Sequence, residues 1–136
     1  MDKVLAIIEH NGKILIGKVK PEKVADFGGI EYVFPGGGIE PGETAEQAVV
    51  REAKEEAVLE VTDVKQIAFR VHPKTGKNIY YFYCKSNTAE VKIDSATNDD
   101  IDQLLWVEKG EVINYMATLN PDVQKYFGLT WAIQKA

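Results

Sequence analysis

The stretch GGIEPGETAEQAVVREAKEEAVL, residues 37–59, decides the fold of this chain. Its first part is rich in glycine, which permits turns and a close approach of the backbone that a side chain would obstruct. Thr44 then stands where a helix N-cap is expected, with Gln47 three residues later in a capping-box spacing. From Ala45 to about Ala57 the residues are mostly good helix formers, without glycine or proline. The sequence therefore predicts a glycine-rich loop that leads directly into an α-helix.

The predicted helix has an apolar side and an acidic side. The apolar side repeats with the helical period and comprises Val49, Ala53 and Ala57, flanked by Val50. The acidic side comprises Glu52, Glu55 and Glu56. An ordinary solvated charge face is one interpretation, but like charges at these spacings repel, and the helix dipole disfavours anions near its C-terminus. Lys54 lies on the far side and cannot neutralise them. A hard divalent cation, Mg²⁺ above all, would turn the acids into a binding site.

This stretch closely resembles the signature of the Nudix hydrolase family (MutT-like). The matching residues are Gly37, Glu43, Arg51, Glu52, Ala53, Glu55, Glu56 and Leu59. The family's last glycine is Val58 here, and a β-branched residue adopts a positive φ only at a cost, so we expect the helix to end differently. The preceding residues 32–36 are similar to the family's lead-in strand. The resemblance implies an α/β fold, a Nudix-type α/β/α sandwich with a mixed central sheet.

The resemblance also implies a role for each matching residue. Glu52, Glu55 and Glu56 correspond to the catalytic, metal-binding glutamates, and the carbonyl of Gly36 corresponds to a recurrent backbone ligand. The positions that support the site structurally are Gly37, Glu43 and Arg51. For the last two, an Arg fork that holds a carboxylate would fix the loop against the helix.

The implied reaction is hydrolysis of the diphosphate linkage of a nucleoside diphosphate derivative. Mg²⁺, with Mn²⁺ as an alternative ion, would bridge the glutamates and the phosphates and lower the pKa of the attacking water. In the family, the base that takes the water's proton is a glutamate of the signature or an acid on a later loop. The later candidates are Asp99, Asp100 and Asp102. We favour Asp100, although each of them also fits an acidic surface loop.

Substrate-binding residues are harder to identify. Phe27 lies in a loop that leads to the glycine-rich turn and is a candidate for stacking on a base, and a surface connection is the alternative. Several cations would suit terminal phosphates or would simply be solvated, namely Arg70, His72, Lys74, Lys18, Lys20 and Lys23. Asn120 fits a helix cap better than recognition of a purine edge. Residues 80–83 fit a strand that alternates between core and surface.

The remaining elements follow from hydrophobic patterns and turn residues. Strands are predicted at 4–9, 13–19, 60–66, 67–71, 78–84, 91–93 and 104–107, with a loop at 21–30. The first two strands form a hairpin across His10-Asn11-Gly12. A short helix is expected from Lys109 toward Met116, and a last one over 122–127 after Asn120-Pro121.

Composition narrows the class of protein. The 136 residues suggest one domain, 1–136, with the apolar and charged fractions of a globular protein. No signal peptide or membrane span is visible, and Cys84, the single cysteine, reads as a buried, inert thiol, so we expect a cytoplasmic protein. The net charge of −5 disfavours a nucleic-acid polymer as partner. A small nucleotide substrate remains compatible, and a homodimer stays open.

Three functions remain. The first is a Mg²⁺-dependent pyrophosphohydrolase that converts a nucleoside triphosphate to the monophosphate and pyrophosphate. The second acts on ADP-ribose or another nucleoside diphosphate sugar. The third is a nucleotide-binding sensor that kept the fold and lost turnover. Release of different products separates the first two, and binding without turnover would identify the third.

Overall fold

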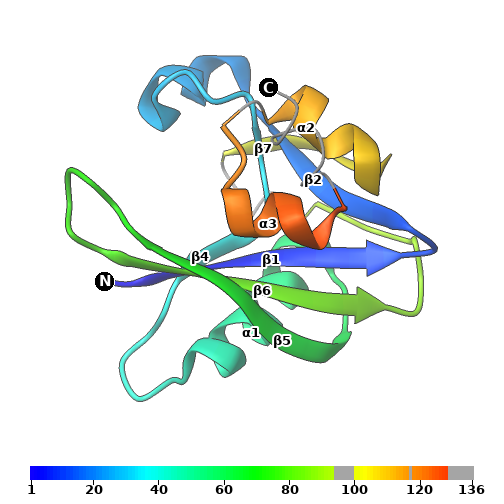
Figure 1. The fold of residues 1–136 in the computed structure, drawn as a ribbon, viewed down its shortest axis with the longest axis horizontal. Helices are drawn as coiled ribbons and strands as arrows, with labels where there is room; N and C mark the ends of the chain where they lie inside the picture. Colours follow the sequence, from blue (N-terminus) through cyan, green and yellow to red (C-terminus); the bar gives the residue numbers. More distant parts are fainter. Residues whose placement is uncertain (94–99, 117, 129–136) are drawn as a thin grey trace.

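The computed structural model describes residues 1–93, 100–116 and 118–128, arranged as a sheet with helices on both sides (Figure 1). The strands are β1 (Lys3–His10), β2 (Lys13–Val19), β3 (Tyr32–Val33), β4 (Gly36–Gly38), β5 (Val61–Val71), β6 (Asn78–Ser86) and β7 (Ile101–Glu108). The helices are α1 (Ala45–Ala57), α2 (Val112–Tyr115) and α3 (Pro121–Tyr126), with 3-10 helices η1 (Pro21–Phe27) and η2 (Lys109–Glu111).

The sheet splits between β1 and β2. These strands pair only beside their tight turn, at Glu9–Ile14 and His10–Lys13. Beyond that point, β4 takes the free edge of β1 and β3 takes the free edge of β2. β6 and β5 continue the β1 half, and β7 pairs with β2. The segment that runs from β3 to β4 therefore crosses from one half of the sheet to the other and bridges the split.

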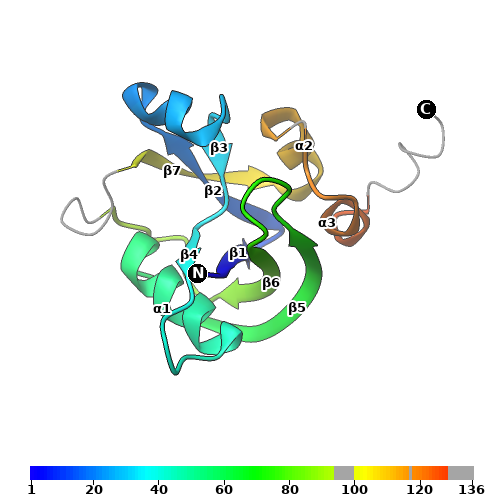
Figure 2. The ribbon, with the colours of Figure 1, turned by 90° about the vertical axis from the view of Figure 1, so that its left-hand side faces the viewer.

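Two apolar clusters fill the space on either side of the sheet. One cluster packs α1 against β1 and β6, and the other packs residues of α2 and α3 against the opposite face. Figure 2 shows α1 on one side of β1 and β6 and α3 on the other. β1 pairs with β6 in parallel and with β2 and β4 antiparallel, so the predicted α/β/α arrangement with a mixed sheet is confirmed.

Helix α1 begins as predicted. The Thr44 side chain accepts a hydrogen bond from the Gln47 amide, and the Gln47 side chain accepts one from the Thr44 amide. The predicted apolar side needs one correction, since Val50 is 42% exposed whereas Ala48 is fully buried. The exposure of Val50 and the burial of Ala48 both follow from the way α1 lies on β1 and β6, which the helical period alone does not specify.

The expectation that α1 ends differently because of Val58 is wrong. Val58 adopts φ 56° and ψ 42°, the left-handed conformation that glycine favours at this position. Its amide donates to the Lys54 carbonyl, and the amide of buried Leu59 donates to the Ala53 carbonyl. Because these hydrogen bonds and the burial of Leu59 hold the chain there, the valine bears the strain.

Other elements match the prediction with three exceptions. The predicted loop at 21–30 contains η1, which begins at a proline in its first turn. Residues 91–93 form no strand, and the Lys92 amide instead donates to the Ala57 carbonyl at the end of α1. The predicted alternation at 80–83 is also wrong. Tyr81, Phe82 and Tyr83 are all buried, because layers cover both faces of β6.

The remaining predictions for these regions hold. The predicted β1–β2 hairpin is present, and the predicted strands 60–66 and 67–71 form one bulged strand, β5 (Val61–Val71), which pairs with β6 as a second hairpin. The Asn120 side chain caps α3 by accepting from the amides of Asp122 and Val123. Cys84 is buried, and burial raises the pKa of its thiol to about 12. Within the described ranges, no helix combines the length and the apolarity needed to cross a bilayer.

Candidate active site

Arg51 holds the glycine-rich loop against α1. Its Nε and Nη2 atoms each donate to a carboxylate oxygen of Glu43, both at 2.8 Å, and Nη2 also donates to the Gly38 carbonyl at 2.9 Å. The Arg51 guanidinium therefore lowers the pKa of Glu43 to about 2. These contacts are the two-pronged support predicted from the sequence, and they fix the backbone on which the neighbouring acids rest.

Glu52 lies against the loop at a point where only glycine fits. Its side chain is 10% exposed, and its Oε1 atom accepts from Arg51 Nη1 at 2.9 Å. A Cβ atom added to Gly37 would lie 2.5 Å from that same oxygen. Burial raises the pKa of Glu52, and Arg51 opposes the rise. Gly37 thus gives Glu52 its place, which agrees with the supporting role predicted for the glycine.

Glu56 is the most perturbed acid of the group. It is half-buried, and its Oε2 atom accepts from the Gly36 amide at 3.2 Å. Burial raises the pKa of Glu56, the hydrogen bond from the Gly36 amide opposes the rise, and the charges of Glu52, Asp100 and Glu55 support it, for a pKa of about 8. Four carboxylates therefore act on one another where the β3–β4 segment bridges the split in the sheet.

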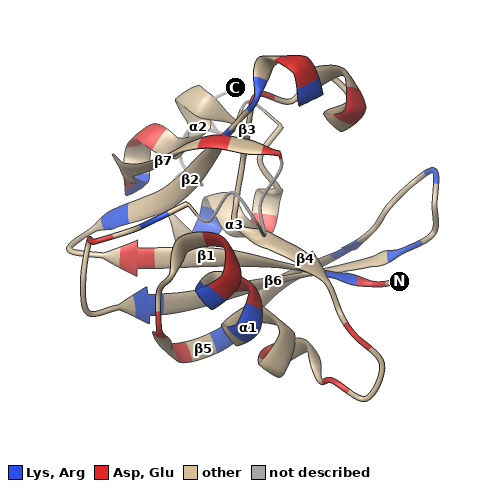
Figure 3. Cartoon of the chain, turned by 180° about the vertical axis from the view of Figure 1, so that it is seen from behind, with Lys and Arg blue, Asp and Glu red and all other residues tan. Residues whose placement is uncertain are grey.

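The acids of α1 are partly neutralised from within the helix. Arg51 Nη1 lies 3.2 Å from Glu55 Oε2, one helical turn away, and also contacts Glu52. Acidic and basic stretches alternate along α1 in Figure 3. Arg51 stands four residues before Glu55, a spacing that favours this ion pair, whereas the sequence prediction named Lys54 alone as a neutralising partner. The charge of Glu56 is therefore less well compensated than the charges of Glu52 and Glu55.

The donor set suits a divalent cation, and its arrangement is open. Carboxylate oxygens are the ligands that Mg²⁺ and Mn²⁺ prefer. Burial first, and the neighbouring carboxylates second, raise the pKa values of Glu52 and Glu56 beside Gly36 and Gly37, so a bound cation would favour the charged forms of both. Within residues 1–93, 100–116 and 118–128, however, no three His, Cys, Asp or Glu side chains converge closely enough to enclose an ion. Glu55, which contacts Arg51, would have to turn toward the other two to complete such a site.

The later acids occupy different positions. Asp100 belongs with the glutamates, since its charge contributes to the raised pKa of Glu56, and its Oδ1 atom lies 4.0 Å from Lys23 Nζ. Asp102 lies in β7 and is exposed. Asp99 falls outside the described residues.

The two proposed substrate-binding residues lie apart from each other. Phe27 is half-buried at the end of η1. Arg70 lies on β5, and its Nε atom donates to the Tyr81 hydroxyl at 3.0 Å, on the sheet face opposite α1.

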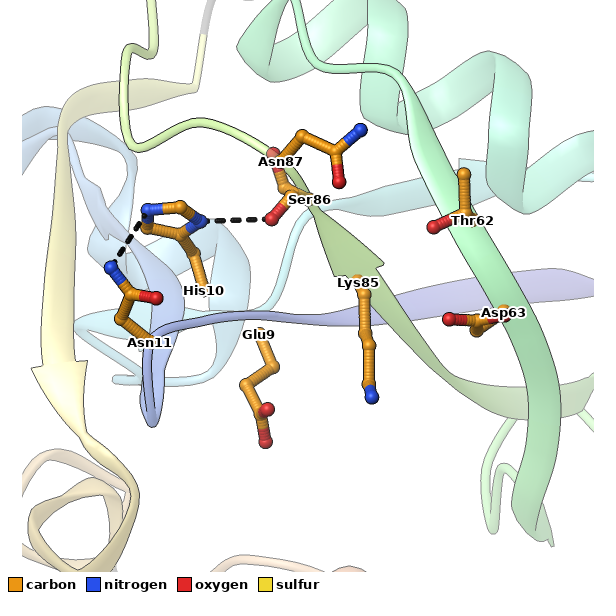
Figure 4. A pocket seen from close by; sticks show the side chains of 8 residues that line it. All are labelled: Glu9, His10, Asn11, Thr62, Asp63, Lys85, Ser86 and Asn87. Atoms are coloured by element: carbon orange, nitrogen blue, oxygen red, sulfur yellow. Dashed lines mark hydrogen bonds between the residues drawn. The ribbon is translucent and has the colours of Figure 1, made fainter.

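An open pocket of about 320 Å³ lies at the far end of the sheet (Figure 4). Its lining residues are Glu9, His10, Asn11, Thr62, Asp63, Lys85, Ser86 and Asn87. The His10 ring donates to the Ser86 carbonyl at 2.8 Å. β4 pairs with the beginning of β1, whereas the pocket lies at the end of β1. The pocket is therefore separate from the acidic cluster.

Comparison with known proteins identifies the same architecture. A family model described as the NUDIX domain matches residues 2–127. A nucleoside triphosphatase NudI from Enterobacter sp. (strain 638) is 35% identical over 115 residues, which cover 78% of this chain and 80% of the relative. The CTP pyrophosphohydrolase of Escherichia coli (strain K12) is 38% identical over 80 residues, 59% of this chain and 57% of that protein. The crystal structure of a NUDIX-family hydrolase from Clostridium perfringens superposes with a TM-score of 0.69 at 21% identity, covering 96% of each chain.

Proposed function

The chain belongs to the Nudix hydrolase family, and on that premise we propose that it hydrolyses a nucleoside triphosphate to the monophosphate and pyrophosphate. The observation that carries this proposal is the burial of Glu52 and Glu56 against Gly37 and Gly36, beside a loop braced by Arg51. The choice of a triphosphate is supported by the relatives named as a nucleoside triphosphatase and as a CTP pyrophosphohydrolase.

Each residue of the site has a proposed task. Glu52, Glu55, Glu56 and the Gly36 carbonyl would hold the divalent metal that Nudix hydrolases generally need, Mg²⁺ with Mn²⁺ as an alternative. When bound, the metal neutralises phosphate charge and lowers the pKa of the attacking water. Gly37 keeps the loop backbone close to Glu52.

The proton of the attacking water needs a base. Asp100 is the later-loop candidate, because its carboxylate acts on Glu56 and is 49% exposed. Asp100→Asn is expected to lower kcat by about 10² to 10⁴ if this carboxylate is the base. A kcat close to that of the wild type would assign the proton to one of the helix glutamates.

Product analysis tests the reaction. The purified protein is incubated with a panel of nucleoside triphosphates and with ADP-ribose, with and without Mg²⁺. We expect pyrophosphate and a nucleoside monophosphate from at least one triphosphate, only with the ion. AMP and ribose phosphate from ADP-ribose would support the second substrate class instead. Nucleotide binding with no product that depends on Mg²⁺ would make the protein a sensor.

Phe27 and Arg70 are proposed to contact the substrate outside the metal site. Phe27 would stack on the base, and Arg70 would meet a phosphate or the base edge. We also propose a single domain over residues 1–136, a cytoplasmic location, and a small nucleotide rather than a nucleic-acid polymer as the partner. A homodimer is the quaternary arrangement that light scattering would test.

A further inference from the structure

The turn that opens η1 is attached to Asp100, the residue directly before β7. The Lys20 amide donates to the Asp100 carbonyl at 2.8 Å, and the Lys23 amide donates to the Lys20 carbonyl at 2.8 Å. Directly beside this point, Val19 of β2 pairs with Ile101 of β7. The backbone of Lys23 is therefore held in place by two paired strands.

The side chain of Lys23 makes a loose ion pair. Its Nζ atom lies 4.0 Å from Asp100 Oδ1, and the two side chains are 39% and 49% exposed. Such an exposed pair contributes little to stability, because water screens it. The Lys23 ammonium can therefore exchange the carboxylate for another anion at little cost.

The charge of Lys23 lies beside a site dominated by acids. Asp100 links the two, since it pairs with Lys23 and its charge also acts on Glu56. The Arg51 guanidinium is committed to Glu43, the Gly38 carbonyl and two acids of its own helix. A polyphosphate that enters this site needs further positive charge from the protein, and a lysine ammonium suits phosphate as a compact charge with three donors.

We propose that Lys23 binds a phosphate oxygen of the substrate and that Asp100 holds the ammonium group in position before the substrate arrives. This inference rests on the proposed function, which supplies the polyphosphate. On binding, the ammonium exchanges its ion pair with the Asp100 carboxylate for a charge-assisted contact with the phosphate, and no covalent bond changes.

The test compares Lys23, beside Asp100, with Lys54, on the exposed side of α1. Lys23→Met removes the charge and keeps the stem, Lys23→Arg keeps the charge, and Lys54→Met makes the same charge change on the exposed side of α1. The dissociation constant of an α,β-methylene nucleoside triphosphate with Mg²⁺ is measured by calorimetry, and KM and kcat are measured with the best triphosphate. We expect Lys23→Met to raise both the dissociation constant and KM about tenfold, the loss of one charge-assisted hydrogen bond to the phosphate.

Lys23→Arg should restore most of the affinity, and Lys54→Met should leave it unchanged. An unaltered dissociation constant in Lys23→Met would overturn the inference, as would an equal change in Lys54→Met, which would indicate a general effect of net charge. Failure of the proposed function gives a different result. In that case the wild-type protein neither binds the analogue nor releases pyrophosphate, whereas failure of the inference alone leaves both intact and merely insensitive to Lys23.

Discussion

Glu43 and Glu56 belong to the same loop and helix, yet the structure shifts the pKa values of their carboxyl groups in opposite directions. Arg51 contacts both oxygens of Glu43 and lowers its pKa to about 2. Glu56 receives one backbone hydrogen bond, and burial beside other acids raises its pKa to about 8. Arg51 therefore compensates the charge of Glu43 in the loop, whereas the charge of Glu56 near the end of α1 is less well compensated.

The opposite pKa shifts distinguish a carboxylate that supports the loop from one that suits a reactive site. A carboxylate with a full complement of donors stabilises its loop and has no reason to bind anything else. An under-compensated carboxylate gains from any cation that reaches it, and perturbed groups of this kind are concentrated at functional sites. The same kind of side chain therefore braces the loop at position 43, whereas at position 56 it is proposed to bind the metal.

The largest expected effect comes from removing the unsatisfied charge. Glu56→Gln, and likewise Glu55→Gln, should each lower kcat by at least about 10³-fold, because each would remove a carboxylate ligand of the proposed metal site. The fold should survive, which circular dichroism and thermal melting would verify. Glu46→Gln, at an exposed position in the first turn of α1, is the control. Activity near that of the wild type in either variant would remove that residue from the mechanism.

Crowding the position of Glu52 should give the next largest effect. In Gly37→Ala the new methyl group would fall 2.5 Å from Glu52 Oε1, so the carboxylate must move. A displacement of this kind costs about 10²-fold in kcat. Gly110→Ala, where the added atom meets nothing within 4 Å, should have no effect. Equal kcat values for the two variants would show that the place of Glu52 is unimportant.

The pH should affect the contributions of Glu56 and Glu43 to the stability of the fold in opposite directions. In metal-free protein the pKa of Glu56 lies at about 8, above its ordinary 4.5, so folding is favoured at low pH and stability falls as the pH rises between these values. Glu56→Gln should therefore raise Tm at pH 8.5 by several degrees and change it little near pH 4.

Glu43 should show the reverse dependence. Its pKa of about 2 lies below the ordinary 4.5, so its contribution is complete above 4.5 and is lost as the pH falls toward 2. Glu43→Gln should lower Tm at pH 7 and have little effect near pH 2. Thermal melts in a chelator measure both variants, and parallel pH profiles would contradict the contrast.

The smallest effect is expected at Val58, the residue directly after α1. Val58→Gly relieves a left-handed valine, worth about 1–2 kcal/mol, against an entropic cost of about 0.5–1 kcal/mol for glycine, for a net stabilisation of about 0.5–1 kcal/mol. Val50→Gly, in the helix interior, should instead destabilise. Chemical denaturation measures both, and a loss of stability in Val58→Gly would mean that the valine side chain makes contacts worth more than the strain.

Local patterns predicted the fold where local interactions decide it. The capping box at Thr44 and Gln47 and the Asn-Gly turn before β2 are set by neighbouring residues, and both appear as predicted. Predictions failed where distant contacts decide. Residues 80–83 looked half-exposed because nothing in the strand itself reveals that both faces of β6 are covered.

The candidate site was partly predictable for the same reason. The spacing of Glu52, Glu55 and Glu56 along one helix identified the acids, and Glu43 with Arg51 identified the brace. The close approach of Glu52 to Gly37 and the effect of Asp100 on Glu56 were not predictable, because they join segments that only the folded sheet brings together.

The division of the sheet between β1 and β2 has an evolutionary consequence. The acids of α1 are anchored to the β1 half, whereas η1 and the start of β7 belong to the β2 half. Because the halves share few hydrogen-bonded pairs, residues on the second half can diversify to suit a new nucleotide while the hydrolytic apparatus on the first stays intact. Such modular inheritance would let one scaffold serve many substrates.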